Sequence, residues 1–209
     1  NVAILGSLTR GAWIAVAVAG TMLLLLRAPR LLLWCPPLLV LLVVLAPTSL
    51  VSRVLSIADP RDLSTYDRLC MASAGLRMIA ERPVTGLGLD MVEQRYPIYR
   101  HPTAPRFVAQ HLHNSYLQVA AERGLPALGA LVWLLGAAMV RSWRHYRLEG
   151  GAKGARADLH LGVLLALFAF AVAALFEHNW GDSEVQRWVL FLLAAPFCLG
   201  PAVAKEVLE

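Results

Sequence analysis

The chain has 209 residues, of which 58% are hydrophobic and only 16% charged, and its mean hydropathy is +0.59. This balance excludes an ordinary soluble domain and indicates a polytopic membrane protein. The net charge of +5 does not indicate nucleic-acid binding, because no face combines basic and aromatic side chains. The sequence begins with Asn1, within what looks like the end of an apolar segment, and shows no signal peptide. We therefore expect a fragment that lacks further N-terminal spans.

Apolar runs predict an all-α, polytopic transmembrane protein with about five spans. As a helix, a run of about 20 apolar residues is long enough to cross the hydrocarbon core of a bilayer. The runs lie at residues 9–26, 31–51, 126–140, 159–176 and 185–199. The predicted organisation is two transmembrane helices in 1–51, a large periplasmic loop in 52–112, and an interfacial helix plus three transmembrane helices in 113–209.

The large loop is charged and contains prolines, yet helical spacing recurs within it. After a capped start at residues 64–67, the apolar residues at helical spacing are Leu69, Ala72, Leu76 and Ile79. This pattern predicts a helix that stops before Pro83. Gly86 and Gly88 then mark a turn, and residues 90–99 are expected to form another short helix.

The loop leads into an elbow at residues 111–128. Asn114 is a good N-cap residue, Gly124 is a typical helix stop, and Pro126 suits the first turn of a following helix. Free amides at the helix start, together with the helix dipole, are expected to form a binding site for an anion. His113 stands beside them, and a neutral imidazole is well suited to take a proton near pH 7. We therefore expect the chemistry to occur at this elbow.

Basic residues gather in the short loops that would share one side of the membrane. They are Arg27, Arg30 and the basic cluster between residues 141 and 156, which is expected to form a short loop. The positive-inside rule makes that side cytoplasmic. The large loop and the polar turn at residues 177–184 would then face the periplasm, with Arg10 at the same outer surface.

Each candidate residue also has a purely structural interpretation. His111 and His113 would point to nearly opposite faces of a helix and have no carboxylate at ligand spacing, so no metal site is predicted. Arg10 could anchor a lipid headgroup and Arg68 could lie on a solvated helix face, although their planar guanidinium groups also match phosphate oxygens. Residues 177–184 form a second outer polar cluster, whose simplest interpretation is a turn and whose alternative is a part in the site.

The sequence resembles the C-terminal half of the O-antigen ligase and polymerase superfamily. Residues 9–13 (Thr-Arg-Gly-Ala-Trp) resemble the family's Ser-Arg-Gly pattern, and residues 81–89 resemble its pattern of proline followed by two spaced glycines. His113 and Asn114, then nine residues, then Gly124 resemble the His-Asn motif of the ligases. Ala127 stands where the ligases have a further glycine, and the first pattern begins with threonine in place of serine.

The resemblance implies a metal-independent glycosyltransferase of lipopolysaccharide biosynthesis. Such an enzyme moves a glycan from undecaprenyl diphosphate to an acceptor hydroxyl, here a lipid A core sugar, without any cofactor, at the periplasmic face of the bacterial inner membrane. Carried over to this chain, His113 would be the catalytic base, and Arg10 and Arg68 would bind the diphosphate. His111 and Asn114 would support the site.

Related chemistries and one non-enzyme remain as alternatives. An O-antigen polymerase would use another lipid-linked glycan as acceptor, and a protein O-oligosaccharyltransferase would use a serine or threonine. A membrane permease or lipid-binding subunit would instead carry polar residues along its spans. The apolar spans, with polar residues gathered at one outer surface, favour chemistry on a lipid-borne substrate.

Overall fold

The described part of the chain is entirely helical in a computed structural model. The model describes residues 10–45, 63–149 and 154–198, and no strand occurs among them. The α-helices are α2 (Arg10–Arg27), α3 (Cys35–Leu45), α5 (Leu63–Glu81), α6 (Met91–Tyr99), α7 (Ser115–Leu148), α8 (Ala155–Ala173) and α9 (Ser183–Cys198). Two 3₁₀ helices accompany them, η1 (Pro29–Trp34) and η3 (Asn179–Gly181). The all-α prediction is therefore confirmed for the described residues.

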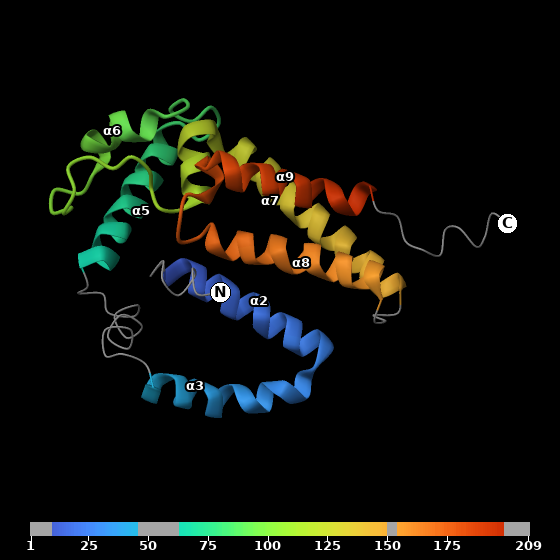
Figure 1. Ribbon diagram of the computed structural model, residues 1–209. Helices are drawn as coiled ribbons and strands as arrows, with labels where there is room; N and C mark the ends of the chain where they lie inside the picture. The colour runs from blue at the N-terminus through green and yellow to red at the C-terminus, as the bar shows by residue number, and fades with distance from the viewer. Residues whose placement is uncertain (1–9, 46–62, 150–153, 199–209) are drawn as a thin grey trace.

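The helices α7, α8 and α9 pack on one another, and α2 packs on α8 (Figure 1). Their shared core is apolar and includes Leu131, Leu135, Leu167 and Leu193. Large apolar side chains also point outward, and Trp133 on α7 is 72% exposed. A helix that is apolar on all sides is typical of a membrane span, because lipid can cover its outer face.

Two helices, α7 and α8, are long and apolar enough to cross a membrane. The apolar parts of the helices α2, α3 and α9 are each shorter than the 18 residues that we require of a span. The expected count of five spans is therefore not confirmed. The run predicted at residues 31–51 is described only as far as Leu45, and the predicted boundary between residues 51 and 52 lies outside the described residues.

Most of the basic cluster after the third apolar run lies on helices, which corrects its prediction as one short loop: Arg141, Arg144 and Arg147 lie on α7 and Arg156 on α8, while Lys153 is outside the described residues. The helix α7 continues beyond Val140 to Leu148, so the first arginines of the cluster lie on its last turns. Arg141 donates from Nε to the carbonyl of Pro196, at 2.8 Å, and its guanidinium lies 4.9 Å from the centre of the Phe197 ring. Cations near a helix C-terminus also interact favourably with the helix dipole, which helps the helix to continue.

The helices α2 and α8 run antiparallel, so the end of α2 meets the start of α8 at one end of the bundle and the start of α2 meets the end of α8 at the other. At one end Arg27 pairs with Asp158, and its guanidinium lies 5.3 Å from the centre of the Tyr146 ring. At the other end a Cβ built on Gly11 would lie 2.6 Å from Cβ of Phe176. The short basic segments therefore share one end, as the sequence predicts, and the candidate site lies at the other.

The elbow has the predicted local structure. The Asn114 side chain accepts a hydrogen bond from the amide of Leu117 at 2.9 Å, so it caps the first turn of α7. Gly124 has φ 82° and ψ 170°, a backbone conformation that only glycine adopts easily. This residue breaks α7 into a short first helix and a long second one, with Pro126 in the first turn of the second.

The elbow and the glycine turn of the large loop pack directly against each other. The amide of Leu87 donates to Ala121 at 2.8 Å, and the amide of Leu125 donates to Pro83 at 2.7 Å. A Cβ on Gly124 would lie 2.0 Å from the carbonyl oxygen of Val84, which leaves no room for any side chain. The two glycine-containing motifs thus meet as one packed joint.

The loop helices form where the sequence predicts them, but α5 faces a different way. Its buried residues include Met71, Ala74 and Met78, which pack on Tyr96 of α6 and on Leu112. Two residues of the predicted apolar stripe, Leu69 and Leu76, are 58% and 60% exposed, whereas Ile79 is partly buried against the core. The stripe therefore contributes only to the edge of the core of the loop.

Candidate functional site

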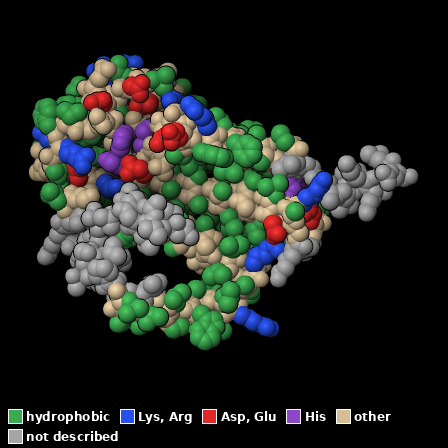
Figure 2. Space-filling view, in the orientation of Figure 1, with side chains coloured by type: hydrophobic (Ala, Val, Ile, Leu, Met, Phe, Trp, Pro, Cys, Tyr) green, Lys and Arg blue, Asp and Glu red, His purple; other side chains and the backbone are tan. Residues whose placement is uncertain are grey.

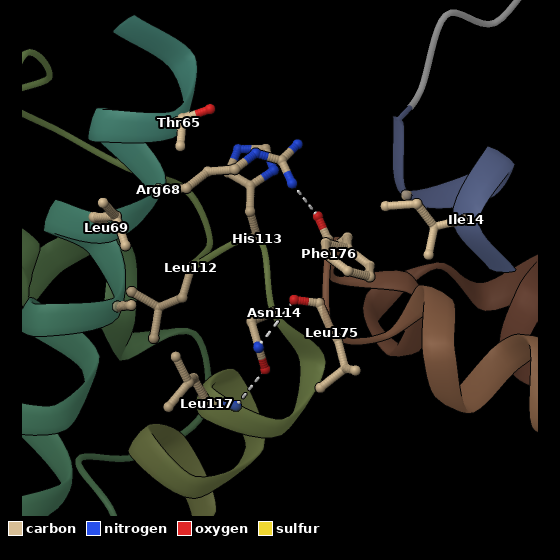
Figure 3. Close-up of a pocket in the computed structure, with 12 residues that line it drawn as sticks. Ile14, Thr65, Arg68, Leu69, Leu112, His113, Asn114, Leu117, Leu175 and Phe176 are labelled. Atoms are coloured by element: carbon tan, nitrogen blue, oxygen red, sulfur yellow. Dashed lines mark hydrogen bonds between the residues drawn. The ribbon is translucent and has the colours of Figure 1, made fainter. Parts of the chain in front are cut away.

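The candidate site forms where four segments distant in sequence come together. Arg68 lies on α5, His113 lies in the irregular segment before α7, and Glu177 lies in the turn after α8. The start of α2 borders the site. Figure 3 shows Arg68, His113 and Asn114 around the same pocket. On this face, histidine, acidic and basic side chains gather near α5, whereas hydrophobic side chains cover much of the bundle (Figure 2).

The central contact of the site joins His113 to Glu177. Nδ1 of His113 lies 2.7 Å from Oε1 of Glu177. A carboxylate only accepts hydrogen bonds, so the imidazole donates from Nδ1, and in its neutral form it keeps a lone pair on Nε2 for a proton. The backbone helps to fix this geometry, since His113 has a φ of 48°, in the left-handed region. The pair therefore has the arrangement of a general base with a carboxylate that orients it.

The carboxylate of Glu177 stays ionised although it is half-buried. Burial alone would raise the pKa of Glu177, but the hydrogen bond and charge of His113, the amide of His178 and the charge of Arg68 together lower it. The amide of His178 donates to Oε1 of Glu177 at 3.2 Å. The hydroxyl of Ser115, at the start of α7, donates to the carbonyl of Glu177 at 3.0 Å and holds the turn in place.

Arg68 supplies positive charge beside this pair. Its Nη1 donates to the carbonyl of Phe176, and its Nη2 lies 3.7 Å from Oε2 of Glu177. The Arg68 side chain is 40% exposed, so part of the guanidinium faces the adjoining pockets. An arginine fixed in this way offers its remaining N–H groups to an anion.

Arg10 is the first residue of α2, and the description covers its backbone but not its side chain. Its neighbours Gly11 and Ala12 line a pocket together with Arg68 and Glu177. The backbone of Arg10 therefore starts α2 at the edge of the site. The predicted contact of its guanidinium with a substrate lies outside the described residues.

Two further histidines surround the central pair. The ring of His111 lies 4.4 Å from the ring of His113, and its Nδ1 is 4.0 Å from Oε1 of Glu177. Burial, followed by the charge of His113, lowers the pKa of His111. Burial also lowers the pKa of His178 to about 4. His111 and His178 are therefore neutral at pH 7.

His111, His113 and Glu177 are also the one group of described residues that could hold a metal ion. Their ligand atoms lie within 4.8 Å of one another. The sequence predicts no metal site, in part because no carboxylate lies at ligand spacing near His111 and His113, but the fold brings Glu177 in from a distant turn. The missing carboxylate is therefore present in the fold, where it already forms a hydrogen bond with His113.

Two amides at the start of α7, where the sequence predicts an anion site, already have acceptors within the protein. The amide of Ser115 donates to the carbonyl of Ala174 at 2.8 Å, and the amide of Leu117 donates to the Asn114 side chain. The Asn114 amide group in turn donates to Leu175 at 3.0 Å (Figure 3). Asn114 thus ties α7 to the segment after α8, and the positive charge described at the site comes from Arg68.

Two cavities adjoin the Arg68 side chain. The first, the apolar pocket, has a volume of about 240 Å³, and its lining includes the side chains of Ile14, Leu69, Ala72, Leu112 and Leu117. The second, the small pocket, has about 110 Å³ and reaches Glu177 and Asn179. Arg68 lines both, so a ligand in either pocket would meet the guanidinium.

Glu177 is the functional candidate that sequence reasoning failed to single out. It belongs to the polar cluster at residues 177–184, whose simplest interpretation was a turn. The segment is indeed a turn with the short helix η3. Its charged residues directly after an apolar span were the available signal, but nothing local shows that they meet His113.

Comparison with known proteins agrees with the resemblance seen in the sequence. The family model described as O-antigen ligase matches residues 2–134, more than half of the chain. The match includes Arg10, Arg68 and His113 and ends before Glu177. A search of curated proteins found no match. Members of the matched family are glycosyltransferase-like enzymes of lipopolysaccharide biosynthesis. The chain belongs to the O-antigen ligase family.

Proposed function

We propose that the protein transfers a glycan from undecaprenyl diphosphate to an acceptor hydroxyl, with a lipid A core sugar as the acceptor. The observation that carries this proposal is the pairing of His113 with Glu177 beside Arg68. Displacement of a diphosphate by a hydroxyl requires two elements, an oriented base, here an imidazole, and a cation close to the leaving group.

The reaction is a single displacement at the anomeric carbon of the donor sugar. His113 accepts the acceptor's hydroxyl proton on Nε2 while the hydroxyl oxygen attacks that carbon. The bond from carbon to the phosphate oxygen breaks, and the lipid diphosphate leaves with one more negative charge. Glu177 stabilises the imidazolium that forms, and direct attack inverts the anomeric carbon.

Arg68 neutralises the charge that develops on the diphosphate, and Arg10 is proposed to share this role. Diphosphate is a good leaving group, so fixed positive charge serves where many soluble glycosyltransferases use a divalent ion. The apolar pocket next to Arg68 suits the first units of the polyprenyl chain, because its lining is mainly aliphatic. His111 and Asn114 support the geometry from either side of His113.

The active site is proposed to face the periplasm from the bacterial inner membrane. The support is the arrangement of charge, since Arg27 packs on Tyr146 and pairs with Asp158 at the opposite end of the bundle. The positive-inside rule assigns that basic end to the cytoplasm.

Purified protein supplied with a defined undecaprenyl-diphosphate glycan tests the proposal. The expected result is transfer to a lipid A core acceptor, with release of undecaprenyl diphosphate. Transfer only to a second lipid-linked glycan would indicate a polymerase, and transfer only to a protein hydroxyl an oligosaccharyltransferase. Absence of transfer to all three acceptors would favour a permease or lipid-binding subunit.

A further inference from the structure

A polar pocket of about 490 Å³ lies beside the candidate site and is separate from the apolar pocket. It reaches His111 and Glu177, and it shares Glu177 and Asn179 with the small pocket next to Arg68. The rings of His111 and His113 are 4.4 Å apart, so only the His111 ring would separate a molecule in this polar pocket from the proposed base. The site is thus bordered by an apolar pocket and by a polar one.

The polar pocket is rich in groups that bind neutral hydroxyls. Asp90 and Asp182 contribute carboxylates, and Gln110 and Asn179 contribute amides that both donate and accept hydrogen bonds. His178 also lines the pocket, and because burial lowers its pKa to about 4, it is an uncharged ring at pH 7.

The charge of this lining is negative on balance. Among the described lining residues none is an arginine or lysine. The charge of Arg123 acts on His178, but Arg123 is not part of the lining. A phosphate group in the pocket would therefore face Asp90, Asp182 and Glu177 without a cation in contact, and like charges repel at this range.

One wall of the polar pocket is fixed before any ligand arrives. Gln118 is only 3% exposed, and its Oε1 accepts from the amide of Leu112 at 2.9 Å. Its Nε2 donates to Glu122 at 2.6 Å. The wall is thereby connected to the residue that precedes His113, so ligand and base are held by the same framework.

We propose that the polar pocket is the acceptor subsite and that it selects an uncharged, hydroxyl-rich sugar over a phosphorylated one. The inference rests on the proposed transfer reaction, whose acceptor must bring a hydroxyl to His113. It divides the site by charge, with the donor's diphosphate at Arg68 and the neutral acceptor among Asp90, Gln110 and Asp182.

Two carboxylates of the pocket can be neutralised without disturbing the fold. Asp182 accepts from the amide of Glu184 at 2.9 Å, and asparagine can keep this bond. Asp90 is exposed and has a φ of 56°, which asparagine also tolerates. The double variant D90N/D182N therefore removes two charges only. The matched control is E93Q/E184Q, which removes two exposed charges outside the pocket.

The test uses two labelled probes, a neutral hexose oligosaccharide and the same oligosaccharide with one phosphate ester. Binding to the full chain in detergent is measured without donor, and acceptor KM is measured with donor. Wild type and control should bind the neutral probe more tightly. In D90N/D182N this preference should fall about tenfold. Each aspartate repels a unit charge on the phosphate about threefold at about 6 Å in a water-like medium, and the variant removes both. Gln110→Ala should raise the acceptor KM and leave the donor KM unchanged.

Binding and transfer separate the two proposals. Pocket-dependent preference for the neutral probe, without transfer by the wild type, would support the subsite and contradict the transfer reaction. Transfer with the same preference in D90N/D182N as in wild type would overturn the subsite alone. Equal binding of both probes to the wild type would also overturn it.

Discussion

Replacing Glu177 by glutamine tests the role of the carboxylate in the central pair. Glutamine keeps the shape and still accepts a hydrogen bond from Nδ1 of His113, so the change removes the charge of the carboxylate, which also faces Nη2 of Arg68 at 3.7 Å. Opposite charges about 4 Å apart attract by about 4 kcal/mol at an effective dielectric of 20 and by about 1 kcal/mol in water. The His113 and Glu177 side chains are 21% and 37% exposed, so solvent screening favours the lower part, about 1–2 kcal/mol.

This loss applies to the transition state, in which His113 carries the proton, and it predicts a fall in kcat of about fivefold to thirtyfold. The assay is transfer from the lipid-linked donor under saturating conditions, with Glu184→Gln as the control, because Glu184 is an exposed carboxylate on the same segment. An unchanged kcat in E177Q, alongside loss of activity on removing His113, would refute the role given to Glu177.

Three further predictions concern charge geometry, packing and pH. Arg68→Lys should lower kcat at least tenfold, since lysine cannot reach Phe176 and Glu177 together; full activity would make Arg68 a surface charge. Gly124→Ala should destabilise the fold by about 3 kcal/mol or more, whereas Gly129→Ala, with open space around it, should be neutral or stabilising; equal melting temperatures would contradict the packed joint. The folded-state pKa of Glu177 is lowered, so the stability that its carboxylate contributes should be complete above the ordinary pKa of 4.5 and lost as pH falls through the lowered value. The melting temperatures of wild type and E177Q should therefore converge in acid, and a gap that widens there would contradict this sign.

Local chemistry explains the parts of the fold that the sequence predicted. Asn114 caps α7 and Gly124 breaks it because these roles depend on one side chain or on its absence. The end of α5 before Pro83 and the start of α6 after the turn at Gly86 and Gly88 follow from proline and glycine in the same way. Such signals act within a few residues and can be read without knowing the tertiary structure.

Tertiary contacts explain what the sequence did not show. Glu177 meets His113 across 64 residues, and only the packing of α7 on α8 brings them together. The amide of Ser115 donates to the carbonyl of Ala174, so the end of a neighbouring helix takes one donor of the expected anion site. Leu69 fitted a core position by spacing, yet it lines the apolar pocket, because spacing identifies a face of a helix but not its partner.

The single-turnover rate of glycan transfer by His113→Ala tests whether His113 is the base. The variant is compared with wild type and with His111→Ala, each inserted in membranes to the same level. His113→Ala should lose about 100-fold or more of the rate, as expected for a positioned general base, while His111→Ala should retain most of it. Full transfer by His113→Ala would show that His113 is not the base, and loss confined to His111→Ala would move the base to His111.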